Sequence, residues 1–193
     1  MARNESSRAV LGPLMGKLRK VQAVAKESSI AWVPVLEGHL AIGHRPKIKT
    51  IKSMHSIGTT HVMTLLSESE GAETVGNHVR QAGLEWFWLP LVSGDPPPDE
   101  RRAEIVQMFD EIRNALNHQA RLYLHCSAGI HRTGLISYAL LRHVGLTSEE
   151  AKNALSQLRQ ETAAGVGLEP HAVGRALVVQ IAEVSEPNRR YTV

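Results

Sequence analysis

The stretch that most constrains the fold runs from Leu122 to Gly134 and reads Leu-Tyr-Leu-His-Cys-Ser-Ala-Gly-Ile-His-Arg-Thr-Gly. Its first three residues form a short apolar run that predicts a buried strand, and the apolar periodicity from Thr133 onward predicts a helix. The short loop between them holds Cys126, the only cysteine of the chain, and Arg132. In a strand–loop–helix unit of this kind, loop amides and the helix N-terminus converge on one point. The segment therefore predicts a binding site for an anion.

The residue types in this loop indicate which anion it binds and what happens to it. The planar guanidinium of Arg132 can hold two oxygens of a phosphate, and Ala128 and Gly129 let the backbone approach a ligand closely. A Cys126 thiol among such donors should have a lowered pKa and be a thiolate at neutral pH. A thiolate beneath a bound phosphate is a nucleophile for phosphorus.

Residues 125–134 resemble the signature loop of the cysteine-dependent protein tyrosine phosphatase superfamily: His-Cys, five residues, Arg, then Ser or Thr. A structural cysteine with an unrelated arginine could share this spacing, but the His, the Ala-Gly and the Thr-Gly in a strand-to-helix context favour the phosphatase loop. The resemblance spans residues 30–160, the size of the small dual-specificity-type domain. Gly43-x-x-Pro46 and Ile57-Gly58-x-x-His61-Val62 also resemble the entry region of those enzymes.

The rest of the pattern agrees with one α/β domain. We expect strands at 32–36, 38–42, 60–66, 84–91 and 122–124 and helices at 46–54, 71–82, 100–117, 133–144, from 147 onward and 169–184, with a loop at 163–167. This alternation predicts a central, mostly parallel sheet of about five strands flanked by helices on both faces. Residues 1–28 form a basic, amphipathic N-terminal extension in this prediction, and residues 29–193 form the phosphatase domain.

Composition narrows the choice of partners and compartment. The net charge of +3 is concentrated in residues 1–28, which carry six Lys or Arg and two Glu, and the pattern there suits a packed helix, a membrane-surface helix or a partner-binding helix. Eight aromatic residues are too few for a basic stripe interleaved with aromatics, so we expect no nucleic-acid binding. A single cysteine, no apolar run long enough for a membrane span and no signal peptide predict a cytoplasmic protein.

Cleavage of a phosphate monoester also requires a proton for the leaving oxygen, and a carboxyl group on a mobile loop usually supplies it. In dual-specificity-type phosphatases this acid lies just past a buried strand, about thirty residues before the nucleophile. Asp95 matches that position, in the loop Val92-Ser93-Gly94-Asp95-Pro96-Pro97-Pro98. Asp99 is the alternative, although it is better placed to cap the helix that follows.

The resemblance assigns roles to the remaining residues of the loop. Thr133 corresponds to the hydroxyl that hydrogen-bonds the sulfur and assists its departure, and His125 supports the loop and tunes the thiol. The residues that should bind the substrate phosphate, mainly through backbone amides, are Ser127, Ala128, Gly129, Ile130 and His131. His131 stands where the family often has glycine, so it should shape the rim of the pocket or add positive charge there.

The resemblance implies a phosphatase that hydrolyses phosphate monoesters of proteins through a cysteinyl-phosphate intermediate. Phosphotyrosine is the expected substrate, with phosphoserine and phosphothreonine as further ones, and no metal or other cofactor is expected. The loop contains no lysine, which argues against phosphoinositides. A phosphoinositide, inositol phosphate or RNA 5′-phosphatase, a non-catalytic phosphoprotein-binding module, and a sulfurtransferase or arsenate reductase remain the alternatives.

Overall fold

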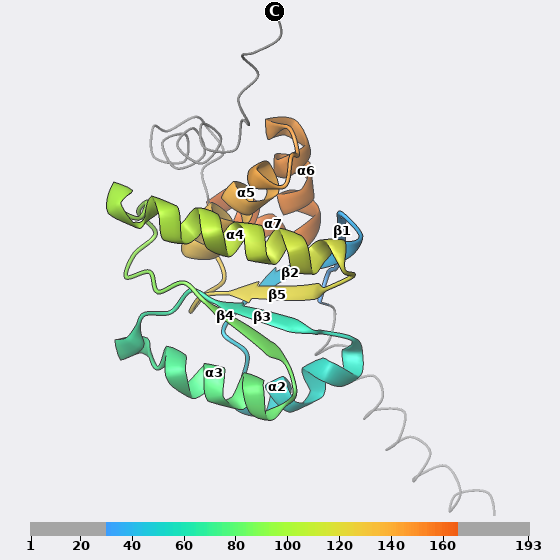
Figure 1. Cartoon of the computed structure of the whole chain (residues 1–193), viewed down its shortest axis with the longest axis vertical. Coiled ribbons are helices and arrows are strands. Elements are labelled where there is room, and N and C mark those ends of the chain that lie inside the picture. The colour runs from blue at the N-terminus through green and yellow to red at the C-terminus, as the bar shows by residue number, and fades with distance from the viewer. Residues whose placement is uncertain (1–29, 166–193) are drawn as a thin grey trace, which may run out of the picture. The chain divides into compact units, whose positions relative to one another are not determined.

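A computed structural model describes residues 30–165 of the chain. These residues form a five-stranded sheet in the order β1-β2-β5-β3-β4 (Figure 1). The strands are β1 (Val33–Val35), β2 (Gly38–Gly43), β3 (His61–Thr64), β4 (Glu85–Trp88) and β5 (Arg121–His125). Only β1 runs antiparallel to its neighbour, whereas β2, β3, β4 and β5 pair in parallel. The predicted extension 1–28 and the predicted helix 169–184 lie outside the described residues.

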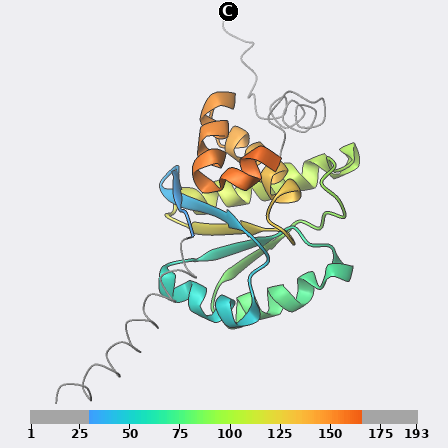
Figure 2. The same cartoon turned by 180° about the vertical axis from the view of Figure 1, so that it is seen from behind.

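Helices cover both faces of the sheet, as Figures 1 and 2 show from opposite sides. One face carries α2 (Ile48–Met54) and α3 (Ala72–Gln81). The other face carries α4 (Arg102–Asn117), α5 (His131–His143), α6 (Ser148–Leu158) and α7 (Gln160–Gly165). The predicted fold class, a mostly parallel five-stranded sheet between two helical layers, is confirmed.

The largest part of the core lies between the sheet and α4, α5 and α6. Helix α4 turns its apolar stripe inward, so that the side chains of Ile105, Phe109, Ile112 and Leu116 are completely buried. The central strand β5 is buried along nearly its whole length, as expected for a parallel strand covered on both faces. Its position is therefore fixed from both sides, and so is the loop that follows it.

Three local expectations from the sequence are wrong. Asp99 does not cap α4: it lies in a 3-10 turn, Asp99–Arg101, and its carboxylate accepts a hydrogen bond from Arg102. Residues 163–165, expected in a loop, belong to α7. Helix α5 begins at His131 rather than at Thr133, which places Arg132 in its first turn.

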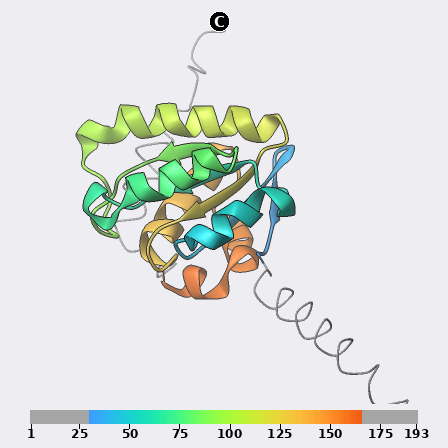
Figure 3. The same ribbon diagram turned by 90° about the horizontal axis from the view of Figure 1, so that it is seen from below.

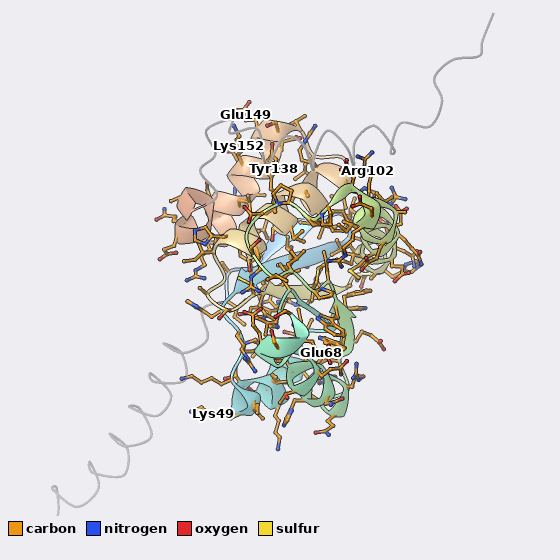
Figure 4. The ribbon with its side chains drawn as sticks, turned by 90° about the vertical axis from the view of Figure 1, so that its left-hand side faces the viewer. Lys49, Glu68, Arg102, Tyr138, Glu149 and Lys152 are labelled. Atoms are coloured by element: carbon orange, nitrogen blue, oxygen red, sulfur yellow. The ribbon has the colours of Figure 1, made fainter. Side chains whose placement is uncertain are left out.

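The parallel strands end at a common edge of the sheet, where ligands bind in open α/β folds. The segments that follow the four parallel strands all begin there: the β2–α2 connection, the turn 67–71, the loop that holds Asp95, and the loop 126–130. In Figure 1 this is the left-hand edge, and Figure 4 looks directly onto it. Figure 3 shows the sheet with α2 and α3 in front.

The packing of α4 predicts a large effect of truncating its central side chain. Phe109→Ala should lower the free energy of unfolding by about 3–5 kcal/mol, because it removes a completely buried ring from the core. Asn114→Ala, on the exposed side of the same helix, should change it by less than about 0.5 kcal/mol. Urea unfolding of both variants measures the difference, and equal effects would contradict the packing described here.

Candidate active site

The cysteine loop, which we define as residues Cys126–Ile130, connects β5 to α5. Its cysteine is only 3% exposed, and the backbone N–H of Gly129 donates a hydrogen bond to Cys126 Sγ at 3.2 Å. The loop thus curls around the sulfur, as the sequence predicts.

The carbonyl groups of the loop are held from the outside. Arg159 Nη1 donates to the carbonyl oxygens of Ala128 and Gly129, each at 3.2 Å, and the Thr162 hydroxyl donates to Gly129 O at 2.6 Å. Because these carbonyl groups point outward, the backbone amides of the loop can point inward and bind an anion. The sequence analysis did not identify Arg159, which directly precedes α7, or Thr162, which lies in α7. Nothing in the local sequence pattern connects either residue with a loop some thirty residues earlier.

Gly129 is required at its position for two reasons. Its φ of +68° lies in the left-handed region, and a Cβ there would collide with the backbone carbonyl of Gly43 at the end of β2. The cysteine loop therefore lies directly against the end of the neighbouring strand.

The surroundings of Cys126 stabilise its thiolate. Burial alone would raise the pKa of the thiol, but hydrogen bonds from the Thr133 hydroxyl and from the amides of Thr133, Gly129 and Ile130 together hold the pKa below its ordinary value. Thr133 is completely buried, and no acceptor in the described part of the chain takes a hydrogen bond of ordinary geometry from its hydroxyl, which leaves the proton available to the sulfur. The geometry therefore brings together the thiol and the hydroxyl that the sequence analysis paired.

His125 is held neutral in a buried chain of hydrogen bonds. Its Nδ1 lies 3.1 Å from the Cys126 carbonyl oxygen and its Nε2 lies 3.0 Å from Thr64 Oγ1. The Trp86 indole N–H donates to the same Thr64 oxygen at 2.9 Å, so the Thr64 proton is directed to Nε2 and the His125 proton is on Nδ1. Burial lowers the pKa of His125 to about 4, which keeps the ring uncharged. Trp86 and Thr64 are thus part of the support of the loop, from strands β4 and β3.

Arg132 is held by a residue that the sequence analysis did not identify. Both carboxylate oxygens of Glu70 accept hydrogen bonds from its guanidinium, at 2.6 and 2.8 Å, and the Leu91 carbonyl accepts another at 2.8 Å. The Arg132 side chain lowers the pKa of Glu70 to about 2, and the hydroxyl and amide of Ser67 assist. The sequence does contain one indication of this role: Glu70 follows a buried strand, β3, that pairs with β5, so it lies at the same edge of the sheet as the cysteine loop.

The loop that holds Asp95 contacts the rim of the cysteine loop. Asp95 is exposed, and its carboxylate accepts a hydrogen bond from the Ser93 hydroxyl at 2.8 Å. A Cβ on Gly94 would lie 2.9 Å from the Cβ of His131, so the backbone beside Asp95 packs on the first residue of α5. The structure therefore brings Asp95, His131 and the cysteine loop to one edge, while their catalytic roles stay predictions.

Within residues 30–165, no group of three His, Cys, Asp or Glu side chains is placed to hold a metal ion. No helix in the same range combines the length and apolarity required to cross a bilayer.

Comparison with protein families gives a match over residues 28–176, to the model described as "Swiss Army Knife protein, DSP-PTPase phosphatase domain". Among curated proteins, none matches the sequence.

Solved structures with the same fold include kinase-associated phosphatase with its catalytic cysteine replaced by serine (TM-score 0.63, 16% identity, 81% of this chain and 94% of that chain). PTPMT1 in complex with PI(5)P has a TM-score of 0.57 and 19% identity, covering 81% of this chain and 99% of that one. Tk-PTP in its active form has a TM-score of 0.55 and 19% identity, covering 82% and 97%.

The ion pair between Glu70 and Arg132 predicts a pH-dependent contribution to stability. Because the pKa of Glu70 is lowered from 4.5 to about 2 in the folded protein, this contribution is fully present above pH 4.5 and is lost as the pH falls through 2. Glu70→Gln should lower the free energy of unfolding by about 1.5–3 kcal/mol at pH 7 and by clearly less at pH 2. Urea unfolding at both pH values measures this, with the exposed Glu68→Gln as the control; a loss of equal size at both would contradict the assignment.

The donors around Cys126 predict its reactivity. The rate at which iodoacetamide alkylates Cys126 should rise with pH. The midpoint of this rise should lie below pH 9.0, the ordinary pKa of the thiol, because the thiolate is stabilised. Thr133→Val removes one donor and should raise that midpoint, whereas Ser127→Ala keeps its backbone amide and should leave it in place. An unchanged midpoint in Thr133→Val would show that its hydroxyl does not face the sulfur.

Proposed function

The chain belongs to the DSP-PTPase phosphatase family, and from this premise we propose that it hydrolyses phosphate monoesters of proteins through a cysteinyl-phosphate intermediate. Phosphotyrosine is the proposed main substrate, with phosphoserine and phosphothreonine as further ones. The observation that carries this proposal is the buried Cys126 thiol with a lowered pKa, inside a loop whose carbonyls are held on the outer side.

The proposed reaction has two halves, of which the first forms the cysteinyl-phosphate. Loop amides and Arg132 bind the phosphate oxygens and orient phosphorus above Cys126 Sγ. The thiolate attacks phosphorus in line, the S–P bond forms and the P–O bond to the substrate breaks. Asp95 donates its proton to the leaving oxygen, which departs as the free hydroxyl.

The second half restores the enzyme. Asp95, now a carboxylate, accepts a proton from water, and the water oxygen attacks phosphorus. The S–P bond breaks, inorganic phosphate is released and Cys126 returns to the thiolate. The Thr133 hydroxyl stabilises that thiolate as it forms, a role supported by its burial and by its effect of lowering the pKa of Cys126.

The choice of a protein substrate rests on the cysteine loop, which contributes no lysine for additional phosphates. One structural neighbour, PTPMT1, was solved with the phosphoinositide PI(5)P, so a phosphoinositide is the second candidate substrate. An RNA 5′-phosphate and a non-catalytic phosphoprotein-binding role are weaker candidates.

Turnover of para-nitrophenyl phosphate and of matched phosphotyrosine and phosphothreonine peptides, without added metal, tests the proposal. Cys126→Ser should abolish turnover, because it removes the nucleophile. Asp95→Asn should lower kcat by about 10²- to 10⁴-fold, since the leaving oxygen loses its proton donor.

Asp99→Asn is the matched control for Asp95→Asn and should retain most of the activity. Among the described residues, the Asp99 carboxylate accepts a hydrogen bond only from Arg102, the first residue of α4. Full activity of Asp95→Asn together with a loss in Asp99→Asn would reassign the acid. A wild-type protein inactive on both peptides but active on PI(5)P would reject the protein substrate.

A further inference from the structure

The segment between β2 and β3 is strongly basic and lies beside the proposed active site. Residues 43–60 contain no Asp or Glu, and their Lys and Arg side chains are all exposed: Arg45, Lys47, Lys49 and Lys52. No described ion pair neutralises any of these four residues. This local excess of positive charge is not used by the mechanism above.

Hydrogen bonds connect this segment to the mouth of the site. The Arg45 amide donates to the Ser127 carbonyl oxygen of the cysteine loop at 3.1 Å, and Arg45 Nη1 donates to the Glu70 carbonyl oxygen at 2.8 Å. Glu70 in turn holds Arg132. Arg45 is therefore placed between the cysteine loop and the turn that carries Glu70.

From Arg45 the positive side chains continue along the chain into the first turn of α2. A surface cavity of about 470 Å³ is lined by Arg45, Pro46, Lys47, Ile48 and Lys49. Ile48 is 46% exposed between the two lysines, which is unusual for a large apolar side chain in this structure. Lys49 lies in the first turn of α2, and Figure 4 shows it in the lower part of the view, far from Lys152 near the top.

We propose that Arg45, Lys47 and Lys49, together with Ile48, form a second recognition site that binds an additional phosphate on a phosphopeptide substrate. We call these four residues the basic strip. The scissile phosphate would occupy the cysteine loop, while a second phosphorylated residue of the same peptide would contact the strip. This inference rests on the proposed function, since it names a class of substrate for the same active site.

The position of the strip favours a peptide over a compact polyphosphate. Its cations lie on exposed side chains beside the loop, not inside it, so the second phosphate must reach out along the surface. Ile48 offers an apolar contact between the cations, which suits an extended chain with mixed side chains. A bilayer is a poorer fit, because only Val92 joins Ile48 as an exposed large apolar side chain at this edge among the described residues. Leu36 and Ile57 are also exposed, but they precede β2 and β3 and so lie at the opposite edge of the sheet.

Two peptides test this: one with a single phosphotyrosine and one with the same sequence and a second phosphorylated residue. The wild type should show a kcat/KM about three- to tenfold higher for the doubly phosphorylated peptide at low salt, as expected for exposed charge pairs. The preference should shrink as NaCl is raised, because salt screens exposed charges. Lys47→Ala/Lys49→Ala should remove the preference, and the control Lys152→Ala should retain it.

The outcomes separate this inference from the proposed function. Equal kcat/KM values for the two peptides in the wild type, or a preference retained in Lys47→Ala/Lys49→Ala, would overturn the strip while leaving the phosphatase intact. If neither peptide is hydrolysed, the proposed function fails, and binding of the two peptides to Cys126→Ser then decides on the strip alone. A loss of PI(5)P vesicle binding in the double variant, with no effect on either peptide, would reject a peptide as the occupant.

Discussion

The site depends on the stabilisation of one buried negative charge. A thiolate removed from water is costly unless hydrogen-bond donors replace the water, and here the donors are backbone amides and one hydroxyl. Amides can face the sulfur only if the carbonyls of the same peptide units face elsewhere, and Arg159, Thr162 and the Arg45 amide provide partners for them. The end of β2 and the start of α7 are therefore as necessary to the cysteine as the loop itself.

The support of the loop comes from polar groups on the strands β3 and β4 and in the turn after β3. Thr64 of β3 and Trp86 of β4 fix the proton position on His125, and Glu70, after β3, fixes Arg132. None of these contacts is local in sequence: Thr64 lies 61 residues from His125 and Glu70 lies 62 residues from Arg132. Parallel pairing brings them together, so the site forms only when the sheet does.

This separation explains what the sequence could and could not predict. The cysteine loop, the alternation of strands and helices and the position of the Asp95 loop depend on short patterns, and the fold class they indicated is confirmed. Glu70, Arg159 and Thr162 act through partners distant in sequence. Arg159 and Thr162 have no local signature, and the place of Glu70 after a buried strand does not identify Arg132 as its partner. Asp99 is not the predicted helix cap because a 3-10 turn follows Pro98 and moves the start of α4 beyond the Asp99 carboxylate.

The pairing of Glu70 with Arg132 has a consequence for how an anionic substrate approaches. With Glu70 ionised and Cys126 a thiolate, these two groups and the Arg132 cation together carry one net negative charge. The net charge of these ionised groups therefore does not attract a phosphate dianion from a distance, and at the end of its path the direct hydrogen bonds from the loop amides and Arg132 favour it. The long-range attraction has to come from cations farther out, so the rate of encounter is set outside the catalytic pocket and depends on ionic strength.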